Sequence, residues 1–143
     1  ATGMAARLDA EDREVLRQAR SNRLQVVSAL HKAGVRMLAG TDTPNIFLVP
    51  GASLHEELAL LVEAGLTPRQ ALLLATRDPA RFLGRSESSG MVKVGYEADL
   101  LLLGSNPLTR ICAVEDVRGV MVDGRWFGTA QLARLAEVLR TLP

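Results

Sequence analysis

The chain has 143 residues, of which 48% are hydrophobic and 23% are charged, a composition typical of one globular domain with a core of its own. Lysine and arginine number 17 against 16 acidic residues, and aromatic residues are scarce, which argues against a nucleic-acid-binding class. The apolar runs stay far below the roughly 20 residues of a membrane-spanning helix, and the single cysteine cannot form an internal disulfide. We therefore expect a cytoplasmic protein with no nucleic-acid and no membrane partner.

The first predicted element is a long helix that begins after Asp9 and ends at Gly34. Asp9 can cap the helix, apolar residues recur at a spacing of three to four, and Gly34 supplies the stop. The next stretch, 35–40, reads "VRMLAG". Because it is short and largely apolar, it predicts a buried strand that runs out into a loop at Asp42.

Three helix starts are predicted in the following stretch. Ser53 with Glu56 has the spacing of a capping box, and Thr67 with Gln70 repeats that spacing for the next helix. Asp78 precedes a proline and is predicted to cap a third, short helix. We expect these residues to set the boundaries of a helical middle segment.

Short strands are predicted in the second half of the chain. The segment 84–90, "GRSESSG", reads as a turn-rich linker, and it is followed by β-like runs at 91–94, 99–103 and 117–122. The order of helix, strand, helices and then short strands predicts an α+β fold.

A hairpin and a closing helix complete the prediction. Asp123 and Gly124 form a two-residue turn signal between two apolar runs. Thr129 is predicted to cap a last helix that extends to Leu142.

Asp42 is the candidate functional residue, and its local sequence leaves two interpretations open. In "LAGTDTPN" (38–45) it suits a turn or a cap, and it also suits a metal ligand at the end of a strand. Cys112 has no histidine nearby in the sequence, so we expect it to be a small buried residue rather than a nucleophile.

Several linked blocks resemble the C-terminal third of a metal-dependent amidohydrolase of the imidazolonepropionase and prolidase-like type. These blocks are "GVRMLAGTD", "SLHEELALLVEAGLTPRQALLLAT", "DPARFLG", "GMVKVGYEADLLLLGSNPL" and "VRGVMVDGRW". The resemblance implies a (β/α)8 barrel joined to a small composite β-sandwich. Residues 1–84 would be the last helix-strand-helix units of the barrel, with 35–41 as its eighth strand. Residues 85–143 would be half of the sandwich and the C-terminal helix.

The resemblance also implies chemistry for the candidate residues. Asp42 matches the family aspartate that contacts a divalent metal, zinc by implication, and exchanges a proton with the attacking water. His55 and Asn45 lie where they could contact the substrate. Asp99 matches a structural position at the start of a sandwich strand.

The family's metal-binding histidines have no counterpart in this chain. Its two histidines are His31 and His55, and His31 matches a helix surface. A zinc site usually takes three protein ligands and a water, so we expect that the chain alone neither retains the metal nor hydrolyses the amide, cyclic amide or dipeptide bonds that the family implies. A missing N-terminal partner chain or a longer parent would supply the rest. The alternative is a catalytically dead truncated domain that self-associates as a homo-oligomer, with a structural or interaction role.

Overall fold

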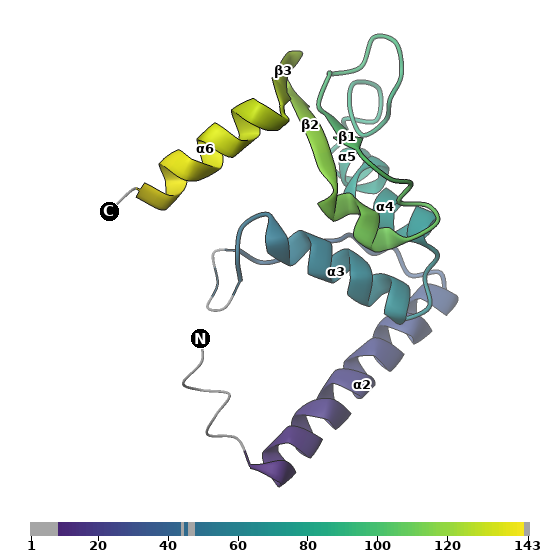
Figure 1. The fold of residues 1–143 in the computed structure, drawn as a ribbon. Coiled ribbons are helices and arrows are strands. Elements are labelled where there is room, and N and C mark those ends of the chain that lie inside the picture. Colours follow the sequence, from purple (N-terminus) through teal and green to yellow (C-terminus); the bar gives the residue numbers. More distant parts are fainter. Residues whose placement is uncertain (1–8, 44, 46–47, 142–143) are drawn as a thin grey trace.

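The computed structural model describes residues 9–43, 45 and 48–141. Helices and strands both occur, which confirms a mixed fold. The helices, labelled as in Figure 1, are α2 (Ala10–Lys32), α3 (Ala52–Glu63), α4 (Pro68–Ala75), α5 (Arg77–Phe82) and α6 (Thr129–Thr141). The strands are β1 (Leu100–Leu103), β2 (Val117–Val122) and β3 (Arg125–Gly128), with a short 3-10 helix, η1 (Ile111–Glu115), before β2. None of the helices in the described ranges is long and apolar enough to cross a membrane.

The core lies where α3, the start of α4 and η1 meet. Leu58 and Leu61 stand one turn apart on the same face of α3, and they pack against η1 and the residues that open α4. Each leucine buried in this way contributes about 1.5–3 kcal/mol. The buried cluster consists of Leu58, Leu61, Leu66, Ala71, Ile111 and Val114.

The two long terminal helices lie outside this core. Helix α2 contacts α3 but has no buried residue of its own, and α6 projects from the sheet, where it contacts β2 and β3. In Figure 1 both helices extend away from the body of the molecule.

Two of the predicted helix starts and one predicted helix end are confirmed. Asp9 caps α2 by accepting the N–H of Asp12 at 2.8 Å, and the Asp12 carboxylate accepts the Asp9 N–H in return. Thr67 and Gln70 form the same reciprocal capping box on α4. Gly34, with φ of 73°, follows the end of α2 as expected.

The predicted capping box at Ser53 is wrong. Gly51 precedes α3 with φ of 87°, so the chain enters the helix earlier than predicted. Ser53 is then the second residue of α3, and its hydroxyl accepts the N–H of Val49 at 2.8 Å. It ties the preceding loop to the helix instead of capping it.

The caps predicted at Asp78 and Thr129 are also wrong. Helix α5 begins at Arg77 and includes Asp78, and Thr129 is the first residue of α6. At that end the side chain of Gln131 accepts the N–H of Gly128 at 3.0 Å. Leu142 lies outside the described residues.

Two predicted strands do not form. The segments 35–41 and 91–94 are irregular, although both have strand-like composition. A strand is held by hydrogen bonds to a neighbouring strand, and no described strand pairs with either segment. Their composition is therefore not sufficient to fix their conformation.

The sheet is an antiparallel meander in the order β1-β2-β3. Leu100 pairs with Met121 across the first ladder, and Val122 pairs with Arg125 beside the turn. The turn residues Asp123 and Gly124 have φ of 49° and 76°, the left-handed values that a type I′ hairpin needs. The predicted hairpin is confirmed.

Gly119 of β2 lies beneath an aromatic ring. The side chain of Trp126 in β3 occupies the space that a Cβ at Gly119 would need, and Gly119 is buried. Close contact between strand backbone and ring is thus possible only with glycine here.

Cys112 was expected to be buried and is exposed. Its neighbours in η1, Ile111 and Ala113, are the residues that face the core. The prediction was wrong because the turn of η1 directs these neighbours inward and leaves the side chain of Cys112 outside.

Candidate functional site

Asp42 lies on an exposed loop that directly follows the irregular segment 35–41. Its backbone has φ of 55°, a left-handed conformation that aspartate and asparagine tolerate better than most residues. The N–H of Asn45 donates to the Asp42 carbonyl at 3.1 Å, and Asn45 Nδ2 donates to Asp42 Oδ2 at 3.3 Å. The structure therefore brings together two of the three residues that the sequence nominated.

The first turns of α3 hold this loop in place. Glu57 Oε1 accepts the N–H of Gly40 at 2.8 Å, two residues before Asp42, and the hydroxyls of Thr41 and Thr43 are 2.9 Å apart. Glu57 escaped the sequence analysis because its partner lies 17 residues away, and no local pattern signals such a bond.

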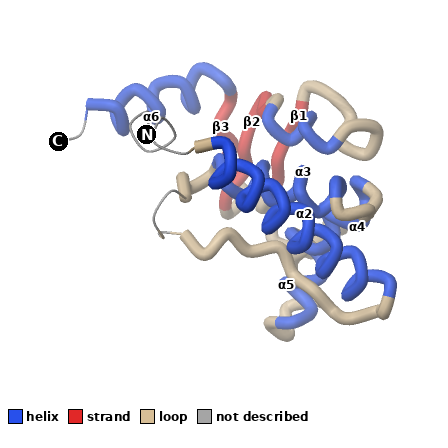
Figure 2. The backbone as a smooth tube through the Cα atoms, turned by 90° about the horizontal axis from the view of Figure 1, so that it is seen from below, coloured by secondary structure: helices blue, strands red, loops and turns tan. Residues whose placement is uncertain are grey.

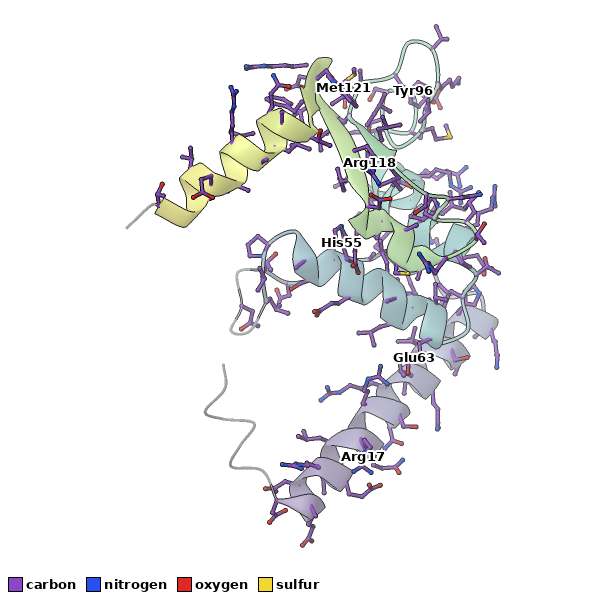
Figure 3. All side chains as sticks on the ribbon, viewed as in Figure 1. Arg17, His55, Glu63, Tyr96, Arg118 and Met121 are labelled. Atoms are coloured by element: carbon purple, nitrogen blue, oxygen red, sulfur yellow. The ribbon has the colours of Figure 1, made fainter. Side chains whose placement is uncertain are left out.

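His55 stands in the first turn of α3 and is half-buried. Figure 3 shows it at the opposite end of that helix from Glu63. Residues two apart on a helix do not share a face, so His55 and Glu57 point in different directions. No hydrogen bond or ion pair joins His55 to Asp42 or Asn45, so its contact with a substrate stays a prediction.

Asp42 has no companions that would complete a metal site in the described part of the chain. No group of three or more histidine, cysteine, aspartate or glutamate side chains is placed there to hold an ion. Because zinc usually needs three protein ligands, these residues alone do not fit a catalytic zinc. The loop supplies one carboxylate and one amide side chain.

An ion pair between Arg20 and Glu63 joins two of the helices. Arg20 of α2 donates to both carboxylate oxygens of Glu63 in α3, at 2.6 and 2.5 Å. The hydrogen bond from Arg20 holds the pKa of the Glu63 carboxyl below its ordinary value and raises the pKa of Arg20. This pair joins two helices and is remote in the fold from Asp42, since it occupies the far end of α3.

Asp99 is a structural residue, as expected. Its carboxylate accepts the N–H of Asp123 at 2.8 Å, and the N–H of Gly124 donates to the carbonyl of Ala98 at 3.2 Å. These bonds fasten the tip of the β2–β3 hairpin to the residues that lead into β1.

A family model described as "Amidohydrolase family" matches residues 5–127. The chain is 36% identical over 91 residues to ochratoxinase from Aspergillus niger, covering 62% of this chain and 18% of that protein. It is 35% identical over 88 residues to imidazolonepropionase from Vibrio vulnificus (strain CMCP6), covering 58% and 20%. The chain thus spans about a fifth of the length of these curated relatives.

A solved amidohydrolase structure is also similar to this chain. The structure resembles that of a bottromycin amidohydrolase with a TM-score of 0.78 and 31% identity, over 94% of this chain and 29% of the other.

Proposed function

This chain belongs to the amidohydrolase family, and we propose that it is the C-terminal part of a hydrolase that cleaves C–N bonds of amides, cyclic amides or dipeptides with a metal-activated water. The observation that carries the proposal is the family match across 5–127, which contains the Asp42 loop. Members of the family are generally metal-dependent. In the complete assembly residues 1–84 would belong to a barrel and 85–143 to a sandwich.

Asp42 would act on the proton of the attacking water. A carboxylate can accept this proton as the water oxygen bonds to the carbonyl carbon, and it can return the proton to the nitrogen as the C–N bond breaks. A bound divalent ion such as zinc would lower the pKa of that water. The remaining ligands would come from outside this chain, because its described residues do not include them.

Asn45 and His55 are proposed to contact the substrate. The contact of Asn45 with the Asp42 carboxylate places an amide group beside the proposed proton acceptor. His55 is on the helix whose Glu57 holds the same loop. The chain alone is proposed to be inactive, and it would need a complementing polypeptide.

The proposal can be tested in a chimera. This chain is grafted into the bottromycin amidohydrolase in place of the segment that it matches, and metal-dependent hydrolysis of the parent enzyme's own substrate is measured. The Asp42→Asn substitution removes the carboxylate but keeps a residue that tolerates a positive φ. We expect kcat to fall by about 100-fold or more. Asp123→Asn is the matched control, because Asp123 is the other aspartate with a positive φ, and it should leave kcat unchanged.

Two outcomes would contradict the proposal. One is full activity in the Asp42→Asn chimera. The other is a chimera whose circular dichroism shows a folded protein but which hydrolyses nothing.

A second candidate function is a self-associating domain without catalysis. It is favoured by the many large apolar side chains that the described structure leaves exposed, among them Val92 at 87% and Val94 at 99%. Monomeric proteins seldom leave large apolar patches open to water. A homo-oligomer would cover such surfaces without any metal or substrate.

A further inference from the structure

A pocket of about 250 Å³ lies in the corner between β3 and α6. It is lined by Arg125, Phe127, Gln131, Arg134, Leu135 and Val138. Side chains two apart on a strand share a face, and so do side chains three, four and seven apart on a helix. One face of each element thus forms this corner pocket. None of Asp42, Asn45 and His55 lines it, so it is separate from the candidate site.

The junction of β3 with α6 gives the corner its shape. The side-chain oxygen of Gln131 accepts the N–H of Gly128 at 3.0 Å, which ties the first turn of the helix to the last residue of the strand. In both Figure 1 and Figure 2, α6 leaves the end of β3 and extends away from α4 and α5. The family match ends at Phe127, whereas α6 begins at Thr129. The helix side of the corner pocket therefore lies outside the matched stretch.

Positive charge gathers in the corner pocket without a negative partner. Arg125 and Arg134 both line it, and none of the described residues that line it is acidic. Neither arginine forms an ion pair with another described residue. The Arg125 guanidinium lies over the Phe127 ring, 5.0 Å from its centre, a contact that helps to hold its position. Like charges that share a pocket repel each other, and a bound anion would lower that repulsion.

The remaining wall of the corner pocket is apolar. It consists of the Phe127 ring with Leu135 and Val138, which are 51% and 57% exposed. Since a water molecule takes up about 30 Å³, the volume of about 250 Å³ suits about eight non-hydrogen atoms. An anion that fills this volume and covers the wall has an apolar chain or ring beside its charged group. A carboxylate is the charged group that guanidinium N–H groups match in pairs.

We propose that the corner pocket binds a small organic carboxylate with an apolar chain or ring. The carboxylate would accept hydrogen bonds from Arg125 and Arg134 and from the amide nitrogen of Gln131, and the chain would cover the apolar wall. Because the charges are exposed, we expect a modest affinity, with Kd on the order of 1 mM at low salt. The inference goes beyond the proposed function and does not rest on it.

The test is an NMR titration of the 143-residue chain with hexanoate, a carboxylate of the size that the pocket volume allows. The amide signals of Phe127 and of 131–138 should shift with added hexanoate and saturate. Hexylammonium has the same chain with the opposite charge, and acetate has the same charge without the chain. Each should bind at least about tenfold more weakly than hexanoate.

A pair of substitutions separates the corner pocket from charge elsewhere on the surface. Arg134→Gln removes one of the two guanidinium groups and keeps a polar side chain on an exposed part of α6, so hexanoate should bind about tenfold more weakly. Arg110→Gln is the matched control, because Arg110 is also exposed and does not line the pocket. It should leave binding unchanged. Circular dichroism checks that both variants keep the helix content of the parent.

Three results would overturn the inference. The first is hexylammonium or acetate binding as tightly as hexanoate, and the second is an equal effect of Arg134→Gln and Arg110→Gln. The third is no saturable shift at 125–138 at a hexanoate concentration about tenfold above the expected Kd. These measurements need neither a metal nor a complementing polypeptide. Their failure would leave the hydrolase proposal standing, and an inactive chimera would leave this inference standing.

Discussion

At the scale of single residues, the site depends on contacts that hold a short loop. Asp42 has a positive φ, and the loop before it is fastened to α3 by the bond from Gly40 to Glu57. The sequence nominated Asp42 as a functional residue only through the resemblance, because its local pattern by itself favours a turn or a cap. It did not identify Glu57, whose role depends on how α3 lies against the loop.

Removing the Glu57 carboxylate should loosen this loop. In Glu57→Ala the Gly40 amide loses its acceptor, and a hydrogen bond to a charged group contributes about 1.5–3 kcal/mol. We expect hydrogen exchange at Gly40 to become about tenfold faster or more in the isolated chain. Glu56→Ala is the control, since Glu56 is exposed and makes no hydrogen bond with a described residue. Unchanged exchange at Gly40 in the Glu57 variant would show that this bond does not hold the loop.

At the scale of elements, the sequence correctly predicted the caps and the turn whose hydrogen bonds join residues close together in the chain. The caps of α2 and α4 and the Asp123-Gly124 hairpin are completed within a few residues, and the sequence predicted all three, although it did not predict the reciprocal bond of Asp12 at the start of α2. The strands at 35–41 and 91–94 were predicted wrongly, because strand formation depends on a partner that the described chain does not provide. Ser53 had the spacing of a cap, but the left-handed Gly51 starts the helix before it.

The two threonines at helix starts should differ in their effect on stability. Thr67 is a genuine N-cap, so Thr67→Ala should lower the free energy of unfolding by about 1 kcal/mol. Thr129 is already inside α6, so Thr129→Ala should change it by less than about 0.5 kcal/mol. Urea denaturation followed by circular dichroism measures both. Equal losses in the two variants would contradict the assigned boundary of α6 or of α4.

At the scale of the whole molecule, the core is small and much apolar surface is open. No large side chain in the described part has less than 2% of its surface exposed. Helices α2 and α6 carry exposed apolar side chains along their lengths, including Val26, Leu135 and Leu139. The sequence predicted the mixed fold and the family. The rest of the proposed larger hydrolase would cover the apolar surface that the described residues leave exposed.

The exposed surface should make the isolated chain associate. We expect light scattering at micromolar concentration to give a mass above the 15.4 kDa of one chain, because association covers apolar side chains. Replacing Leu135 and Leu139 by glutamate should lower that mass, whereas glutamate at Ala133, on another face of α6, should not. A well-behaved monomer before any substitution would remove the self-associating alternative.

The packing of Trp126 over Gly119 has a practical consequence for all of these experiments. Trp126 is the only tryptophan of the chain, so fluorescence excited at its absorption band reports on a single point in the β2–β3 hairpin. That point lies outside the Asp42 loop. A variant with altered hydrolysis and an unchanged emission spectrum has therefore kept the packing of Trp126 against β2, and its defect lies outside the β2–β3 hairpin. A red-shifted spectrum would instead reveal that the hairpin itself has opened to water.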